Sequence, residues 1–527
     1  MKLFASKLSA GQRPGFCFGQ LYLGLSLVLC LALFFATKAN ATAVFSNAND
    51  TTFMAAREAA RTGNSLRLAQ AVAALPVDHV LRPWAEYWQL QQQLVANAES
   101  ETGVVDNSLI LSFLQTHAGS YLAEKLREDW LRYLGKKSDW ARFTPEFPLL
   151  SAPDSTLNCY AAQAAGTPQK VRPLWLSAQE LPAACMPLVN QLAATGDLTT
   201  EEIWQRVRRM LALRKVGAGK TAAAYLPAEQ NFERGDLEAI AVDPDRYLKR
   251  LSPKLATTRR EREMALFAIQ TLARKDVMAA AIQLRSIEKK LPAADAHYAW
   301  AQLARLAAGK HLPVALAWYD LAAETPLDEE QMAWHVRAAL RAQDWARVQR
   351  VVAAMPAEWA QRPEWIYWQA RALTALHQTE QANALFLRIA GQPNFYGQLA
   401  AEELGWTIRL PLQAPPPSAE EITAAETNPG LQRALELFRL DMRVEGVREW
   451  NWSLRGMSDR MLLAAANLAR RNTVWDRAIA SADRTQDMHD FSLRYLAPYH
   501  DQVTAETTAQ NIDTAWVYGL IRQESRF

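Results

Sequence analysis

The fold of this chain is decided by the stretch WAQLARLAAGKHLPVALAWYDLAAETPLDEEQMAWHVRAALRAQDW, which runs from Trp300 to Trp345. Trp334 follows Trp300 after 34 residues, and Trp368 follows after another 34. Other positions keep the same period, first small residues after each tryptophan and then apolar residues later in each unit: Ala304, Ala338 and Ala372, then Val314, Val348 and Ala382. A repeat of this length predicts a helical hairpin that recurs along the chain.

Hairpins of this period, which are tetratricopeptide-like, cannot cover their own apolar faces, so neighbouring units must stack. A large side chain facing a small one at matched height lets adjacent helices interlock. Turn signals separate the expected helices at Ala308–His311, Ala342–Asp344 and His377–Thr379. We therefore interpret the in-register tryptophans as core residues. Their alternative use, as platforms for stacking on sugar rings, is disfavoured by this register.

The composition of the whole chain also favours helix. Hydrophobic residues make up 50% of the 527 residues, and glycine is scarce at 21. Helices without a clean period are expected from Phe53 to about Leu251. The stretch RLPLQAPPPSAEEITAAETNPG, residues 409–430, combines three consecutive prolines with polar residues and predicts a linker that is semi-extended through Pro415 to Pro417. A second, shorter helical block is expected after it.

The first 41 residues have the pattern of a secretory signal peptide. They carry four basic residues and no acidic one, an apolar run from Leu21 to Ala36, and the small-residue site Ala39-Asn40-Ala41. An uncleaved membrane anchor is the alternative, although a run of 16 is short for a bilayer span. Cleavage leaves 54 Lys and Arg against 55 Asp and Glu. A nearly neutral mature chain carries no electrostatic signature of nucleic-acid binding.

Two cysteines, Cys159 and Cys185, remain after cleavage of the expected signal. An even number of cysteines in an exported chain predicts a disulfide bond between them. Two buried free thiols are the alternative interpretation.

Several catalytic or cofactor motifs are excluded. The stretch VGAGKTA, residues 216–222, suggests a phosphate-binding loop, but the required first glycine is replaced by Arg214 and the preceding segment reads as helix. The eight histidines are dispersed, with no His-Glu-x-x-His pattern and no cluster with cysteine, so no metal site is expected. There is no Gly-x-Ser-x-Gly motif either. We expect no cofactor.

The C-terminal stretch DTAWVYGLIRQESRF, residues 513–527, predicts a helix capped by Asp513. Val517, Leu520 and Ile521 form an apolar stripe, and Glu524 continues it, so the Glu524 carboxyl is expected to face the core. A carboxyl group held against apolar walls keeps its proton closer to neutral pH, as a general acid requires. The alternative is a solvated glutamate, or one paired with Arg522 or Arg526.

Three segments resemble the soluble lytic transglycosylases. IRQESRF, at residues 521–527, resembles the opening motif of their lysozyme-like domain, in which the glutamate is the catalytic acid; that residue here is Glu524. NFYGQLAAEELGW, at residues 394–406, resembles the end of their helical superhelix. HDFSLRYLAPYHDQV, at residues 489–503, resembles the segment that leads into their catalytic domain. The two cysteines also stand roughly where family members carry a bridge.

The resemblance implies an all-α protein: a ring-like superhelix of helical-hairpin repeats, then a small helical linker domain, then the first helix of a lysozyme-like domain. The expected divisions are listed in chain order: a signal peptide at 1–41, the superhelical domain at 42–408, the Pro-rich linker at 409–430, the small helical domain at 431–506, and an incomplete lysozyme-like domain at 507–527.

The resemblance also implies a function. Family members cut the bond between N-acetylmuramic acid and N-acetylglucosamine in peptidoglycan without water and leave a 1,6-anhydro product. We therefore expect a periplasmic protein whose partners are glycan strands and cell-wall synthesis or remodelling proteins, with no nucleic acid, and no membrane after signal cleavage; a closed superhelix would suit a monomer. The family's later catalytic motifs are missing from these residues, so the chain as given is expected to be inactive. The alternative is a non-catalytic periplasmic scaffold that binds glycan or protein partners.

Overall fold

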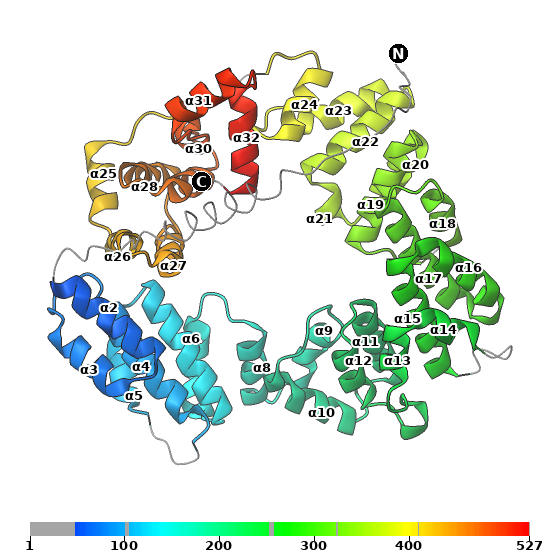
Figure 1. Cartoon of the computed structure of the whole chain (residues 1–527), viewed down its shortest axis with the longest axis horizontal. Coiled ribbons are helices and arrows are strands. Elements are labelled where there is room, and N and C mark those ends of the chain that lie inside the picture. The colour runs from blue at the N-terminus through cyan, green and yellow to red at the C-terminus, as the bar shows by residue number, and fades with distance from the viewer. Residues whose placement is uncertain (1–47, 101–104, 252–257, 323–324, 409–410, 526–527) are drawn as a thin grey trace, which may run out of the picture. The chain divides into compact units, whose positions relative to one another are not determined.

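The computed structural model describes residues 48–100, 105–251, 258–322, 325–408 and 411–525 (Figure 1). Within these ranges all regular structure is helical, which confirms the predicted all-α class, and an isolated bridge joins Gln413 to His489. None of the described helices is both long enough and apolar enough to cross a membrane. The predicted signal peptide lies outside the described residues.

The chain divides into two compact units. The first contains the described residues up to Gln89 together with Pro429–Asn451. Its helices are α2 (Ala48–Arg61), α3 (Ser65–Ala74), the start of α4 (Arg82–Ala98), α26 (Pro429–Arg439) and most of α27 (Arg443–Ser453). Arg439 joins the two stretches, because its guanidinium bonds both carboxylate oxygens of buried Asp50 at 2.7 and 2.9 Å.

The second unit contains Leu90–Asn428 and Trp452–Phe527. Its helices before the repeats are α5 (Asn107–Thr116), α6 (Tyr121–Lys136), α7 (Trp140–Glu146), α8 (Ser155–Ala164), α9 (Arg172–Trp175), α10 (Met186–Ala194), α11 (Thr200–Ala212), α12 (Val216–Ala223), α13 (Asp236–Val242) and α14 (Pro244–Lys249). Short 3-10 turns lie between some of these helices and after α16: η1 (Phe147–Leu149), η2 (Pro168–Val171), η3 (Ala183–Cys185), η4 (Ala228–Gln230) and η5 (Glu288–Lys290).

The 34-residue period corresponds to helix pairs, as predicted. The paired helices are α15 (Arg259–Lys275) with α16 (Val277–Ile287), α17 (Ala293–Gly309) with α18 (Ala315–Ala322), α19 (Glu329–Arg341) with α20 (Trp345–Ala353), and α22 (Pro363–Ala375) with α23 (Thr379–Ile389). The short α21 (Ala357–Ala360) precedes α22, and α24 (Phe395–Glu403) follows α23. Helix α17 packs on both α15 and α19, so successive units stack on one another.

The predicted turns are confirmed. His311, Gln343 and His377 each have a positive φ, between 55° and 61°, at the end of the first helix of a pair. A left-handed residue ends a helix by letting following amides bond to its last carbonyls. The chain uses non-glycine residues here, which costs conformational energy that the packed hairpins must offset.

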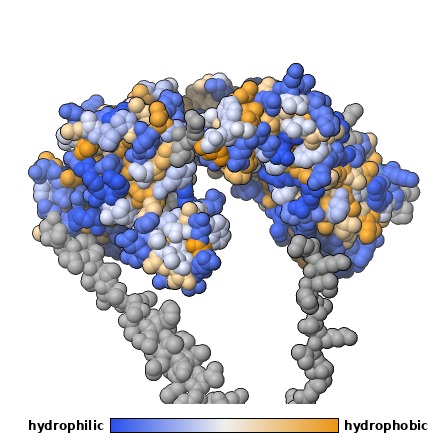
Figure 2. All heavy atoms as spheres, turned by 90° about the horizontal axis from the view of Figure 1, so that it is seen from above, coloured by the Kyte–Doolittle hydropathy of each residue, from blue (hydrophilic) through white to orange (hydrophobic). Residues whose placement is uncertain are grey.

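The repeat tryptophans belong to the core, as predicted. Trp300 is 2% exposed, and Trp334 and Trp368 are half-buried and pack against buried apolar clusters. Ala304, Ala372 and Val348 are fully buried beside them. Figure 2 shows hydrophilic and hydrophobic residues interspersed over the face in view.

A buried ionic network ties three helices of the second unit together. Arg208 of α11 bonds Glu263 of α15 at 2.7–3.1 Å and Asp295 of α17 at 2.5 Å. Arg259 and Arg262 of α15 bond the same two carboxylates at 2.7 and 3.0 Å. The side chains of Glu263 and Asp295 are only 1% and 5% exposed. Buried charges of this kind require complete pairing.

Within the described part of the predicted linker, residues 411–430, Pro415–Pro417 lie outside any helix, as predicted, but a helix follows them. Helix α25 (Ala419–Glu426) forms there, and it packs on α28 (Asp459–Arg471). Ser418 and Glu421 form a capping box that starts α25. Arg460 then fixes Glu421 to α28 at 2.5 and 2.8 Å. The Ser-x-x-Glu pattern at Ser418–Glu421 is a signal for a helix start, but helix α25 was not predicted because the neighbouring prolines indicated a linker.

Candidate functional site

The segment with the candidate catalytic glutamate forms the last described helix. After α29 (Trp475–Ala482), α30 (Phe491–Arg494) and α31 (His500–Ala509), helix α32 runs over Thr514–Glu524. Asp513 caps it as predicted, because its carboxylate accepts from the amides of Ala515 at 2.7 Å and Trp516 at 3.2 Å. At the other end of α32, Glu524 is the last helical residue.

Polar contacts hold α32 against the preceding helices. The Arg522 guanidinium bonds both carboxylate oxygens of Asp483 at 3.0 Å and lies 4.8 Å from the centre of the Tyr495 ring. The Tyr518 hydroxyl donates to the carbonyl of Pro498 at 2.8 Å. Nη2 of Arg522 donates to both carboxylate oxygens of Asp483, and Nη1 donates to the carbonyl of Arg494, so contacts in two directions fix the guanidinium. Arg522 therefore sets the position of the helix end that carries Glu524.

The expectation that Glu524 faces the core is wrong for the described residues. Glu524 is exposed, and no residue of α32 is buried. Trp516 and Leu520, which share a stripe with Glu524 at four-residue spacing, are 64% and 48% exposed. Glu524 is exposed because α32 is anchored on its other side, through Arg522 and Tyr518. No described apolar residues pack over the stripe of Trp516 and Leu520.

The alternative that Glu524 pairs with Arg522 is also wrong, because Arg522 is engaged by Asp483. Arg526 lies outside the described residues. The described residues alone neither enclose a substrate beside the Glu524 carboxyl nor exclude water from it.

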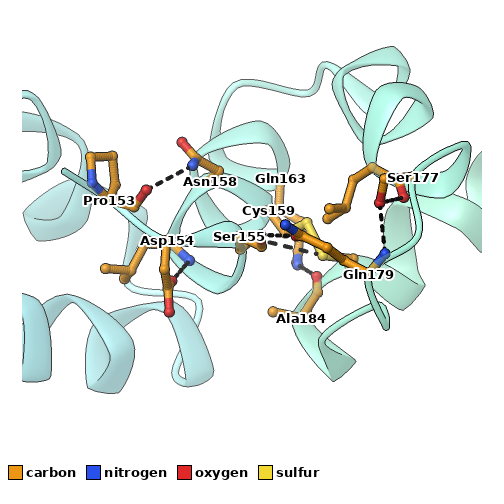
Figure 3. The surroundings of a disulfide bond; sticks show 12 residues. Pro153, Asp154, Ser155, Asn158, Cys159, Gln163, Ser177, Gln179 and Ala184 are labelled. Carbon is orange, nitrogen blue, oxygen red and sulfur yellow. Dashed lines mark hydrogen bonds between the residues drawn. A yellow bond between two sulfur atoms is a disulfide. The ribbon is translucent and has the colours of Figure 1, made fainter. Parts of the chain in front are cut away.

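The predicted disulfide bond is confirmed. Cys159 of α8 and Cys185, just before α10, are joined with an S–S distance of 2.04 Å, and both are buried. Figure 3 shows the surroundings of the bond, where the Gln163 side-chain amide donates to the carbonyl of Ala184 at 2.5 Å. The bond and this contact hold the loop between α9 and α10 on α8.

The stretch VGAGKTA adopts helix α12 after helix α11, so it lacks the strand that a phosphate-binding loop requires. Among the described residues no group of three or more His, Cys, Asp or Glu side chains is arranged to hold a metal ion.

Sequence reasoning did not identify the anchors of α32. Tyr495 lies in the quoted stretch 489–503, but it was assigned no role. Asp483 carries no motif at all, because its partner lies 39 residues away and only the folded chain brings them together. Arg522 was considered only as a partner of Glu524, and its pairing with Asp483 was not predicted.

Comparisons with known proteins are consistent with one another. Residues 424–490 match the family model of the soluble lytic murein transglycosylase L domain. The soluble lytic murein transglycosylase of Escherichia coli K12 is 23% identical over 472 residues, which cover 85% of this chain and 69% of that protein. The protein of the same name from Salmonella typhimurium is 23% identical over 463 residues, with the same coverage.

Solved structures share the helical fold. An inactive mutant of the lytic transglycosylase Slt from Pseudomonas aeruginosa superposes with a TM-score of 0.68 at 24% identity, covering 90% of this chain and 77% of that one. A complex of the 70-kDa soluble lytic transglycosylase with bulgecin A superposes with a TM-score of 0.60 at 21% identity, covering 91% and 77%. At these identities the superpositions establish the fold.

Proposed function

Because the chain is homologous to the soluble lytic murein transglycosylases, we propose that it is a peptidoglycan lytic transglycosylase whose helical repeats are the scaffold and whose catalytic carboxyl is Glu524. The position of Glu524 carries the assignment. It lies in IRQESRF at the end of α32, and the Arg522–Asp483 ion pair ties that helix to the segment that matches the L domain.

One carboxyl group is sufficient for the proposed reaction. Protonated Glu524 would donate its proton to the glycosidic oxygen, and the N-acetylmuramic acid C1–O bond would break. The resulting carboxylate would take the proton of the C6 hydroxyl of the same sugar, and that oxygen would bond to C1 to close the 1,6-anhydro ring. No second carboxylate at the spacing found in ordinary glycosidases is required.

The exposure of Glu524 sets a condition on this chemistry. Water must be kept from C1 until the ring closes, and the saccharide must be held in place. We propose that further parts of a lysozyme-like domain cover the stripe of Trp516 and Leu520 and enclose the glycan. The periplasm is the proposed compartment, glycan strands are the proposed partners, and the residue divisions predicted from the sequence stand as part of this proposal.

The experiment treats purified sacculi with the protein that contains a complete catalytic domain and measures 1,6-anhydromuropeptides by mass spectrometry. Glu524→Gln should lower the rate by about 10²–10⁴-fold, the usual contribution of a general acid. Glu506→Gln, which changes another exposed glutamate on neighbouring α31, is the matched control and should keep the rate. A normal rate in Glu524→Gln contradicts the assignment.

The exposure of Glu524 also favours a second candidate, a non-catalytic scaffold. If the unaltered protein releases no anhydromuropeptide but sediments with sacculi, this candidate replaces the first.

A further inference from the structure

A cavity of about 710 Å³ in the second unit lies between the start of α12 and the loop that follows α9. Its apolar walls come from Trp175, Leu181 and Met186. Its polar lining is basic, with Arg206, Arg214 and Lys215, and one carboxylate, Glu180. Val216, Gly217 and Ala218, the first residues of VGAGKTA, line the cavity. The proposed function gives this stretch no role. The cavity is separate from Glu524 and independent of the proposed activity.

Arg206 is the unusual member of this lining, because it is only 3% exposed. Its guanidinium donates to the carbonyls of Trp175 at 3.1 Å, Ser177 at 2.8 Å and Gln179 at 2.6 Å. A guanidinium has five N–H groups, so two remain without an acceptor among the described residues. All three acceptors are neutral carbonyls. The guanidinium carbon also lies 5.8 Å from the centre of the Trp175 ring, but no carboxylate among the described residues hydrogen-bonds to the buried charge.

The environment of Arg206 disfavours its charge. Burial, together with the nearby charge of Arg209, lowers the pKa of the Arg206 guanidinium, and Glu180 only partly opposes this effect. An anion that entered the cavity would offset this cost. Buried charges are normally paired, and this one has room for a partner beside it.

The start of α12 adds further donors. The N-cap residue Lys215 makes no side-chain bond to the helix, and no acceptor among the described residues meets the amide N–H groups of Val216, Gly217 and Ala218. A β-carbon built on Gly217 would meet nothing within 4 Å, so its amide is open to approach. Amides and dipole at a helix start both favour negative charge.

The basic side chains at the rim are not fully neutralised. Lys215 has one ion pair, with Glu180 at 3.4 Å, and the Glu180 side chain is 63% exposed. Arg214 is exposed and has no ion pair in the described ranges. Three positive groups and one negative group leave the cavity with an excess of positive charge.

From the cavity, the buried unbalanced guanidinium and the open amides, we propose that this cavity binds the oxyanion group, a carboxylate or a phosphate, of a small ligand. The oxyanion would accept from Arg206 and the first amides of α12, with Lys215 turning from Glu180 toward it. Any apolar part of the ligand would pack against Leu181 and Met186.

The test titrates the chain at low ionic strength, where exposed charges are screened least. Three probes are used in calorimetry: inorganic phosphate, N-acetyl-Ala-Leu with a free carboxylate, and the same peptide with a C-terminal amide. Hydrogen exchange of residues 214–221 reports the location. Saturable binding of phosphate or of the free-acid peptide is expected, with protection at α12 and with no binding of the amide.

Lys215→Asp is the decisive variant. Aspartate is a preferred N-cap residue, so its carboxylate should bond the first amides of α12 and occupy the proposed anion position. Its melting temperature should be unchanged or higher, while the Kd should rise at least about tenfold, or 1.4 kcal/mol. A folding defect therefore cannot mimic loss of the site. Arg214→Gly, which relieves a φ of 62°, should also weaken binding without lowering stability.

Lys220→Gln is the matched control, because Lys220 lies farther along α12 and pairs with Glu238. It should bind like the unaltered chain. Binding of phosphate alone assigns a phosphate ligand, and binding of the free-acid peptide alone assigns a carboxylate. The proposal is overturned if neither probe binds at concentrations up to about 10 mM, a limit near −3 kcal/mol, or if Lys215→Asp binds as tightly as the unaltered chain.

Discussion

Arg208→Met should destabilise the packing of α11, α15 and α17 by about 3–5 kcal/mol, the range observed when one partner of a buried ion pair is removed. Arg208 makes four contacts within hydrogen-bonding distance to the carboxylates of Glu263 and Asp295. Its burial opposes the charge, but the attraction and hydrogen bonds of the two carboxylates outweigh burial and raise the pKa of Arg208. The arginine therefore stays charged.

The magnitude depends on what remains after the change. Arg259 and Arg262 each keep one bond to the network, but Glu263 and Asp295 lose their shared cation in a region that is almost closed to water. Methionine approximates the length of the arginine stem, so the lost packing is small. Arg208→Lys keeps a charge without the bidentate geometry, and should cost less, about 1–2 kcal/mol.

Native-state hydrogen exchange is the suitable assay, because stacked repeats open locally and a single unfolding transition does not describe them. Amides of α15 and α17 should exchange about 10²–10⁴-fold faster in Arg208→Met, the factor that corresponds to about 3–5 kcal/mol. The control is Arg471→Met, since Arg471 pairs with Glu426 at 3.0 Å and both side chains are nearly half exposed. Such a pair contributes roughly 0–1 kcal/mol.

The reasoning is refuted if Arg208→Met accelerates exchange in α15 and α17 by less than about fivefold, or 1 kcal/mol. It is equally refuted if Arg471→Met, which breaks an exposed pair, has the same effect on its own helix.

Three further changes test other parts of the structure. Replacing Cys159 and Cys185 with alanine should cost about 3.5 kcal/mol in the chain-entropy model for a separation of 26 residues, measured by denaturant-dependent exchange in α8 and α10; unchanged protection contradicts it. Burial, reinforced by the charge of Arg347, lowers the pKa of His335 to about 4. Because the unfolded chain binds that proton already near pH 6.5, stability of α18 and α19 should fall by about 2 kcal/mol from pH 7 to pH 5, and His335→Phe should remove that fall. Gly397→Ala should lower the local stability of α24 by about 1–3 kcal/mol, measured by hydrogen exchange, because the new β-carbon would lie 2.2 Å from the carbonyl oxygen of Gln392; unchanged protection of α24 argues against that close contact.

Local patterns were the successful part of the sequence reasoning. The spacing of Trp300, Trp334 and Trp368 predicted the stacked hairpins, and Asp513 predicted the start of α32. The count of two cysteines after the predicted signal peptide predicted the bond between Cys159 and Cys185. Each of these depends on residues close in sequence, or on a pair with no competing partner, so the amino-acid order alone contains the information.

The failures concern contacts between distant residues. The apolar stripe of α32 predicted a buried Glu524, but burial depends on what packs against a helix, and the described contacts cover another side of it. The prolines of residues 409–430 predicted a linker, but not that helix α25 forms after them and packs on α28.

By itself, then, the amino-acid sequence determined that this protein is built from helices, where the repeating pairs turn, which cysteines join, and which glutamate carries the catalytic resemblance. Only the tertiary structure decided that Glu524 stands in solvent on a helix held by Asp483, that Arg208 balances two buried carboxylates, and that the buried Arg206 hydrogen-bonds to neutral carbonyls and to no carboxylate. The physical reason is that periodicity and capping are set by neighbours within a few residues, whereas desolvation and charge pairing depend on groups that only folding brings together.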